Sequence, residues 1–199
     1  MAVDAKKVLV GTPDQLTTGA ILNAPVGTEL PTLDDVKPSG VTLDEAFVDA
    51  GYANEDGLTL TPDMSTSTIK EWGGAVVRTV LEEFNGTLAF TLIQTDEASL
   101  KMAFGDDHVT SEAATAEHGN QLMAAIGARL PEQKAWVFKM KDGAARMLVL
   151  VPIGQVTALD EVTFNATDPV GWAVTLSTSP DENGNSIYIL TDDGQVATA

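Results

Sequence analysis

The stretch AVVRTVLEEFNGTLAFTLIQTDEASLKMAFG (75–105) contains the signals that decide the fold. Residues 75–84 are rich in β-branched side chains, which favour strands. Residues 86–95 alternate large and small side chains, the large ones being Leu88, Phe90 and Leu92. Asn85-Gly86 lies between these runs and is a strong hairpin signal, because both central residues of a type I′ turn need positive φ. The pattern therefore predicts two strands joined by a tight turn.

A change of hydrophobic period follows the second predicted strand. Thr95 or Asp96 can cap the N-terminus of a helix, and Gly105 can end it. Two apolar residues within this segment lie four positions apart, Leu100 and Phe104. The sequence predicts one short helix at about 96–104, packed on a sheet.

More strand candidates follow toward the C-terminus. Residues 134–143 alternate and end at Asp142-Gly143, a second hairpin signal, after which residues 145–152 return. Other candidates are 156–167, 171–180 and 186–190. Residues 106–133 are ambiguous: their composition allows a broken helix, and their glycines allow a loop and a strand. The pattern predicts a mainly β fold, a β-sandwich or barrel of two sheets with one packed helix and long loops. The side chains expected in its core are Leu88, Phe90, Leu92, Leu100, Phe104, Trp136, Phe138 and Leu148.

No long helix is expected upstream of residue 75. Residues 1–40 are expected to be extended or looped, because their prolines break any long helix. Residues 38–74 combine glycines, acidic residues and hydroxyl side chains, and predict a long surface loop within a single domain, 1–199. This segment also carries apolar side chains, so we expect something to cover it.

The composition excludes several classes of function. The 199 residues include 29 acidic and 11 basic ones, for a net charge of −18. Eleven scattered cations cannot neutralise many phosphates, which argues against a duplex nucleic acid as a tightly bound ligand. The chain has no cysteine, so it has no disulfide, thiolate zinc site or cysteine nucleophile. We expect no signal peptide and no membrane segment, because no apolar run approaches ~18 residues.

The charges are unevenly distributed. Acidic residues dominate 41–74 and 153–199, whereas residues 134–147 carry four cations, Lys134, Lys139, Lys141 and Arg146. One interpretation is an ordinary acidic surface. The other is that acidic and basic faces of different copies meet, since complementary patches fix the register of an interface.

Residues suited to catalysis are not arranged in any recognisable pattern. His108 and His118 are ten positions apart, whereas helical metal ligands need three or four. Asp106-Asp107 lacks the alternating acids of a calcium loop. The nucleophile-elbow and phosphate-loop motifs do not occur. We therefore expect no enzyme, no catalytic residue, no cofactor and no metal.

Three stretches carry a resemblance to a known family. They are GYANEDGLTLTPDMSTSTIKEWGGAVVRTV (51–80), NGTLAFTLIQTDEASLKMAFG (85–105), and KAWVFKMKDGAARMLVLVPIGQVT (134–157) followed by WAVTLSTSPDENGNSIYIL (172–190). Together they cover about half of the chain. Their order and turn patterns resemble the major tail tube proteins of long-tailed, non-contractile bacteriophages (siphoviruses), particularly those that infect actinobacteria.

The resemblance implies a structural virion protein that is made in the cytoplasm of the host bacterium. Subunits of this family form homohexameric rings, in which the inner sheets join into one β-barrel, and the rings stack into a tube. The implied partners are other copies of the chain, the tape-measure protein, and the tail terminator and tip proteins. Double-stranded DNA passes through the tube during genome ejection without tight binding.

The resemblance also suggests roles for individual residues. The lighter faces of the two central strands would line the lumen, with Arg78, Glu82, Thr87 and Thr91. Val77 and Leu81 would instead face the core. The long loop would be mobile in the monomer and would contact neighbouring subunits or rings through Phe47, Tyr52, Leu58, Leu60 and Trp72. Alternatives are a monomeric acidic β-sandwich that binds a ligand, a hydrolase, a related capsid decoration protein, or a tube protein of a related injection machine.

Overall fold

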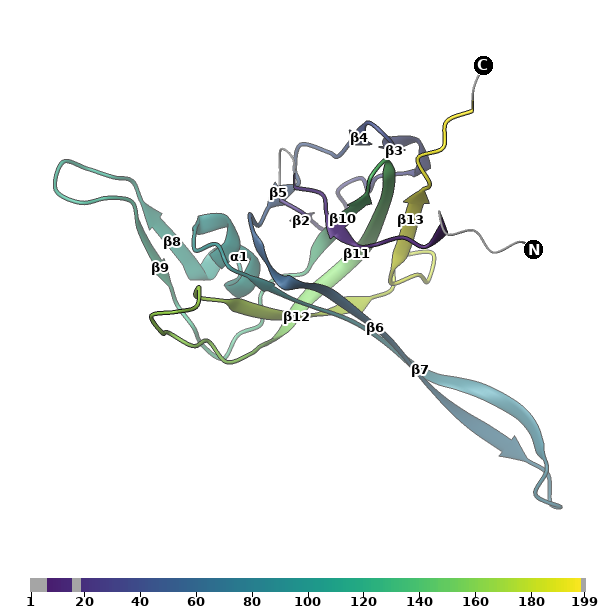
Figure 1. The fold of residues 1–199 in the computed structure, drawn as a ribbon. Helices are drawn as coiled ribbons and strands as arrows, with labels where there is room; N and C mark the ends of the chain where they lie inside the picture. Colours follow the sequence, from purple (N-terminus) through teal and green to yellow (C-terminus); the bar gives the residue numbers. More distant parts are fainter. Residues whose placement is uncertain (1–6, 16–18, 198–199) are drawn as a thin grey trace.

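Strands make up most of the regular structure in residues 7–15 and 19–197, which the computed structural model describes (Figure 1). One α-helix accompanies them, α1 (Glu97–Phe104). The mainly β prediction with one short helix is therefore confirmed. The expected loops of residues 1–40 fall partly on 1–6 and 16–18, which lie outside the described residues. The strands are β1 (Thr12–Pro13), β2 (Ile21–Pro25), β3 (Val36–Lys37), β4 (Gly40–Val41), β5 (Val48–Asp49), β6 (Ala53–Lys70), β7 (Val76–Leu92), β8 (Val109–Glu112), β9 (Gln121–Ala124), β10 (Lys134–Asp142), β11 (Ala145–Leu159), β12 (Trp172–Ser179) and β13 (Tyr188–Asp192).

One nine-stranded sheet dominates the fold. Its strands follow the order β5-β2-β10-β11-β12-β7-β6, while β1 adds to β10 and β13 adds to β11. Two small sheets, β3-β4 and β8-β9, complete the pairing. Every strand pair in the large sheet is antiparallel.

The large sheet curls so that distant strands face each other across a core. β11 and β12 separate β7 from β10 in the sheet, yet the rings of Phe90 and Phe138 lie 5.5 Å apart. A second cluster covers the other face of β10 and β11, around Val137 and Leu148. These two strands are therefore buried on both faces. All eight predicted core side chains are buried, as expected.

The helix has the predicted boundaries and capping residue. Asp96 accepts a hydrogen bond from the Ser99 amide at 2.8 Å, and the Gly105 amide closes the last turn on the Lys101 carbonyl. Leu100 and Phe104 are buried against the core, as the spacing predicted.

The prediction of a long loop over 38–74 was wrong for residues 53–70, which form β6. The segment 58–61, LTLT, alternates with the period of a strand. Leu58 and Leu60 turn toward the core, while Thr59 and Thr61 turn away from it. Pro62 is tolerated because β6 is an edge strand.

The predicted turn at Asn85-Gly86 was also wrong, because β7 runs without interruption through both residues. Gly86 does not have positive φ. It is buried, and a Cβ there would lie 2.5 Å from Thr178 Oγ1 and 2.9 Å from Ile187 Cδ1. Glycine is therefore required at this position for close packing between strands rather than for a turn.

We expect Gly86→Ala to lower the free energy of unfolding by about 1–3 kcal/mol, because the added methyl overpacks this contact. Gly119→Ala is the matched control, since no atom lies within 4 Å of a Cβ there and φ is not positive. Thermal and urea unfolding of the two variants measure the difference. Equal stabilities would contradict the packing role of Gly86.

The second hairpin signal was correct. Asp142 pairs with Ala145, and Gly143 has φ of +59°. Residues 156–159 extend β11 instead of starting a new strand, and the rest of the candidate 156–167 is not strand. The ambiguous region 106–133 contains the β8-β9 hairpin.

The cations of residues 134–147 do not form the exposed basic face that one interpretation required. Lys134, Lys139 and Arg146 are each less than a tenth exposed. Lys134 pairs with Asp106 at 2.7 Å, and Asp14 lies 3.3 Å from Lys141 and 3.6 Å from Arg146. Burial also lowers the pKa of Lys139. None of the four cations is exposed, and Lys134, Lys141 and Arg146 pair with carboxylates of the same chain, so they do not form a basic patch.

Candidate functional site

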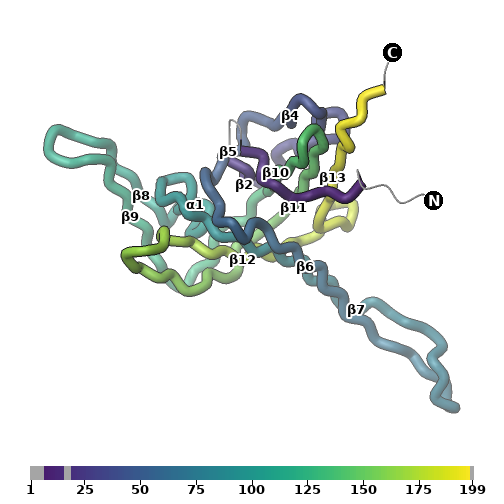
Figure 2. Tube along the Cα trace, in the orientation of Figure 1, coloured from purple at the N-terminus to yellow at the C-terminus, as the bar shows by residue number. Residues whose placement is uncertain are grey.

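A long two-stranded ribbon leaves the body of the molecule (Figure 2). β6 and β7 pair from Ala53 opposite Leu92 to Lys70 opposite Val76. We call residues 63–85, beyond the pairing of Pro62 with Gly86, the arm. Ser67 and Val80 are half-buried, and every other residue of the arm is exposed. A two-stranded ribbon has little stability of its own, so the arm has the character of a segment that packs on a partner.

The base of this ribbon has two chemically distinct faces, because directly paired residues lie on the same side of a sheet. The inner face packs in the core and carries Leu58, Leu60, Leu88, Phe90, Leu92, Val174 and Leu176. The outer face carries only hydroxyl and methyl side chains, and we call it the hydroxyl face: Thr59, Thr61, Thr87, Ala89, Thr91, Ala173, Thr175 and Ser177. It carries no charged side chain, so it has no cation that could hold a phosphate.

The structure brings three of the four lumen candidates onto one side of the ribbon. Thr87 and Thr91 belong to the hydroxyl face. Arg78 lies farther along the same side. It pairs with Ile69, whereas Thr87 pairs with Thr61. Ile69 and Thr61 are an even number of positions apart on β6, so their side chains point the same way. Glu82 falls in a register shift, where Ser65 pairs with Glu83 and Thr66 with Leu81, and it has no partner on β6.

Acidic residues outnumber the arginine on this side of the arm. Asp63 pairs with Asn85, and Ser65 pairs with Glu83, so both carboxylates extend the hydroxyl face. The sequence analysis expected small, hydroxyl and acidic side chains here. The acids lie in the arm, whereas the part over the body is uncharged.

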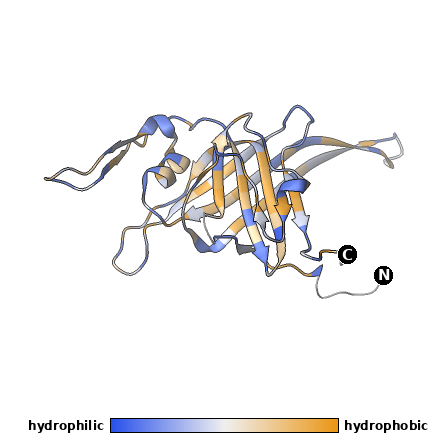
Figure 3. Cartoon of the chain, turned by 90° about the horizontal axis from the view of Figure 1, so that it is seen from above, coloured by the Kyte–Doolittle hydropathy of each residue, from blue (hydrophilic) through white to orange (hydrophobic). Residues whose placement is uncertain are grey.

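The other side of the arm exposes apolar side chains. Met64 pairs with Phe84, and Leu81 follows, with exposed fractions of 65%, 38% and 57%. The expectation that Val77 and Leu81 face the core was wrong, since the arm extends past the body and both are more than half exposed. Apolar residues therefore continue along the arm from the strands of the body (Figure 3).

Two of the five proposed contact residues remain accessible. Tyr52 is 63% exposed, and Trp72 at the arm tip is fully exposed. Phe47 is buried in the second core cluster, and Leu58 and Leu60 pack on the first. The expectation that these three need a partner from outside the chain was wrong. Leu58 and Leu60 reach the core through β6, which was read as a loop, and Phe47 reaches it from the segment just before β5.

The outer edge of β6 is a feature that the sequence analysis missed. β6 is the last strand in the sheet order, and no strand in the described part of the chain pairs with its outer edge. An 18-residue edge presents a row of backbone donors and acceptors to any strand that approaches. The alternation of residues 58–61, LTLT, was the signal that could have revealed it.

Residues 7–15 and 19–197 contain no group of three or more His, Cys, Asp or Glu side chains that could hold a metal. The pKa of Asp181 is lowered, mainly by the hydrogen bond from Tyr188, and this pair orders a surface turn. No helix among these residues is long and apolar enough to cross a membrane.

Comparisons with known proteins identify one family. A family model described as phage tail tube protein matches residues 1–199. No curated protein matches at a significant level. One similar solved structure is the anti-feeding prophage cap (AFP tube terminating cap), at 14% identity and a TM-score of 0.44, covering 96% of this chain and 100% of that chain. Another is a PVC sheath–tube complex in the extended state, from an extracellular contractile injection system, at 9% identity and a TM-score of 0.41, with the same coverage.

Proposed function

The chain belongs to the phage tail tube protein family, and we propose that its copies form hexameric rings that stack into the tube for genome ejection. The family gives the chain a structural role in the virion tail. The ring, the stacking and the passage of DNA are our proposal.

The observation that carries this proposal is the interface that the single chain leaves uncovered. An 18-residue edge strand and an arm with one apolar side are both exposed. Exposed edges promote open-ended aggregation unless they are paired, and closure of a sheet into a barrel removes them. A closed ring of subunits pairs each edge with a neighbour and gives the arm a surface on which to pack.

The hydroxyl face is suited to a channel wall. Its eight side chains cannot form an ion pair with phosphate, and the net charge of −18 surrounds it with a repulsive field. We propose that Thr87 and Thr91 face the lumen and that Asp63 and Glu83 extend this wall along the arm. Arg78 would then lie farther along the same side, separated from Glu83 by the Ser67–Val80 pair. The register leaves the side of Glu82 open, because Glu82 has no partner on β6.

The proposed partners are other copies of the chain, the tape-measure protein around which the tube grows, and the terminator and tip proteins at its ends. Double-stranded DNA is a passing cargo.

Negative-stain microscopy of the concentrated, full-length protein tests the proposal. We expect hollow tubes of uniform diameter, and native mass spectrometry of short assemblies should show multiples of about 125 kDa, six times the 20.9 kDa chain. A protein that stays monomeric at every concentration, or forms solid fibres, would contradict it.

A further inference from the structure

The arm ends in an ordered turn that presents one large apolar side chain. The Glu71 amide donates to the Ala75 carbonyl, and the Gly74 amide donates to the Glu71 carbonyl, both at 2.9 Å. Gly74 has φ of +89°, which a residue with a side chain rarely adopts. Trp72 lies within this turn and is fully exposed. A preorganised, solvent-exposed tryptophan is typical of a side chain that anchors an interface.

A groove of about 310 Å³ lies on the body. The end of β11, which forms one of its walls, is on the side of the body away from the arm (Figure 1). Its walls are residues 127–131, which follow β9, and residues 156–159 at the end of β11. The apolar side chains Leu130 and Leu159 line it and are 62% and 40% exposed. Gln155 Nε2 donates to the Pro131 carbonyl at 2.8 Å and so ties the two walls together. The groove is therefore already formed in the single chain.

The charges beside the tip and the groove are complementary. Glu71 precedes Trp72, and Arg129 is the one charged residue that lines the groove. Among the ion pairs of the described residues, neither Glu71 nor Arg129 takes part. Most other cations near the body are already paired with carboxylates of the same chain, so Arg129 is available to a neighbour.

We propose that Trp72 of one copy inserts into the groove at 127–131 and 156–159 of a second copy, where Glu71 pairs with Arg129. This inference rests on the proposed self-assembly, and it identifies the residues through which two copies contact each other. The tip and the groove are different surfaces at opposite ends of the molecule, so the contact is head-to-tail. Such a contact repeats from copy to copy and generates a closed ring or a helical stack.

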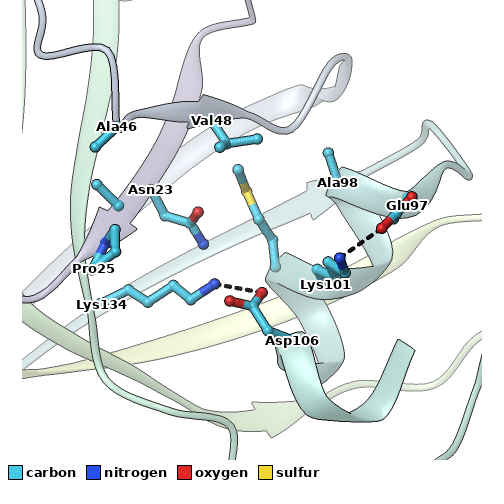
Figure 4. A pocket seen from close by; sticks show the side chains of 11 residues that line it. Asn23, Pro25, Ala46, Val48, Glu97, Ala98, Lys101, Asp106 and Lys134 are labelled. Carbon is cyan, nitrogen blue, oxygen red and sulfur yellow. Dashed lines mark hydrogen bonds and ion pairs between the residues drawn. The ribbon is translucent and has the colours of Figure 1, made fainter. Parts of the chain in front are cut away.

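A larger pocket of about 540 Å³, between β2, β5 and α1, is a less suitable acceptor (Figure 4). Its two cations are already occupied, Lys134 by Asp106 at 2.7 Å and Lys101 by Glu97 at 2.6 Å. Asn23 Nδ2 is buried there without an acceptor in the described chain, so this pocket favours a ligand with a carbonyl group. The indole N–H is a donor and cannot satisfy it.

Thiol cross-linking tests the contact directly, because the chain has no cysteine of its own. We expect Ala75→Cys, beside the tip, to cross-link with Ala128→Cys, in the groove, when the two variants are mixed and assembled. Each variant alone should give no cross-linked dimer, since the contact is head-to-tail. Ala46→Cys, which lines the larger pocket, is the matched control and should not react with Ala75→Cys.

A charge reversal tests the ion pair. Glu71→Arg and Arg129→Glu should each raise the concentration needed for assembly several-fold, and the double variant should restore it. Trp72→Ala should raise that concentration at least tenfold, with Trp72→Phe intermediate. The substituted residues are exposed, so circular dichroism spectra should stay unchanged.

The outcomes separate this contact from the proposed function. Tubes that form normally, with Ala75→Cys cross-linking to itself or to Ala46→Cys, would overturn the contact and leave the tube intact. Normal assembly of Trp72→Ala, or the absence of rescue in the double charge variant, would also overturn it. An unsubstituted protein that never forms tubes would overturn the proposed function first.

Discussion

Replacement of residues 63–85 by Asn-Gly is expected to abolish tube formation and leave the body of the subunit folded. Pro62 and Gly86 are directly paired, so a two-residue turn can join them without a change of register. The core residues of β6 and β7 lie on the body side of that junction. The variant therefore loses the whole arm, including its tip, while the buried contacts remain.

Size-exclusion chromatography and negative-stain microscopy measure this result. A soluble monomer with a cooperative thermal transition and no tubes is expected at concentrations where the unsubstituted protein assembles fully. The matched control replaces residues 113–120, between the paired ends Glu112 and Gln121, by the same turn. Normal tubes from the variant without the arm would show that the arm has no role in assembly.

The second large effect is expected from Thr87→Lys combined with Thr91→Lys. Both side chains lie on the hydroxyl face, opposite residues of β12, and are half-buried at the edge of solvent. Tubes should still assemble, because neither side chain packs in the core. Each ring would then present twelve cations to the DNA in a hexameric tube, and phosphates bind lysine strongly. Genome ejection should slow at least tenfold at low ionic strength and recover as salt screens the attraction.

Thr110→Lys with Gln121→Lys is the matched control, since it adds the same charge on the exposed β8-β9 hairpin. Ejection should be unaffected in this variant. Equal ejection rates in both variants at every salt concentration would place the hydroxyl face outside the channel.

Local signals predicted those elements whose determinants lie within a few residues. Asp96, Leu100 and Gly105 correctly predicted the helix, because capping and side-chain spacing act within one or two helical turns. Asp142-Gly143 gave a correct hairpin, because Gly143 adopts the positive φ of the turn. The large alternating side chains of β7 and β10 correctly predicted which residues of these strands are buried in the core.

Asn85-Gly86 shows where such signals fail. The dipeptide is as favourable for a turn as Asp142-Gly143, but Thr178 and Ile187, about 90 residues away along the chain, determine the environment of Gly86. The same holds for β6, where Gly57 and Pro62 favour a loop locally. Its strand conformation comes from pairing with β7 along almost its whole length. That misreading also misplaced the contact residues, because Leu58 and Leu60 reach the core only through this pairing.

The orientation of the ribbon within an assembled tube is best measured by a cryo-electron microscopy reconstruction of tubes of the unsubstituted protein. We expect six subunits in each ring, the outer edge of β6 paired with a neighbouring subunit, and Thr87 and Thr91 facing the channel. A reconstruction in which this face points outward, or in which the edge of β6 stays unpaired, would contradict the proposed tube.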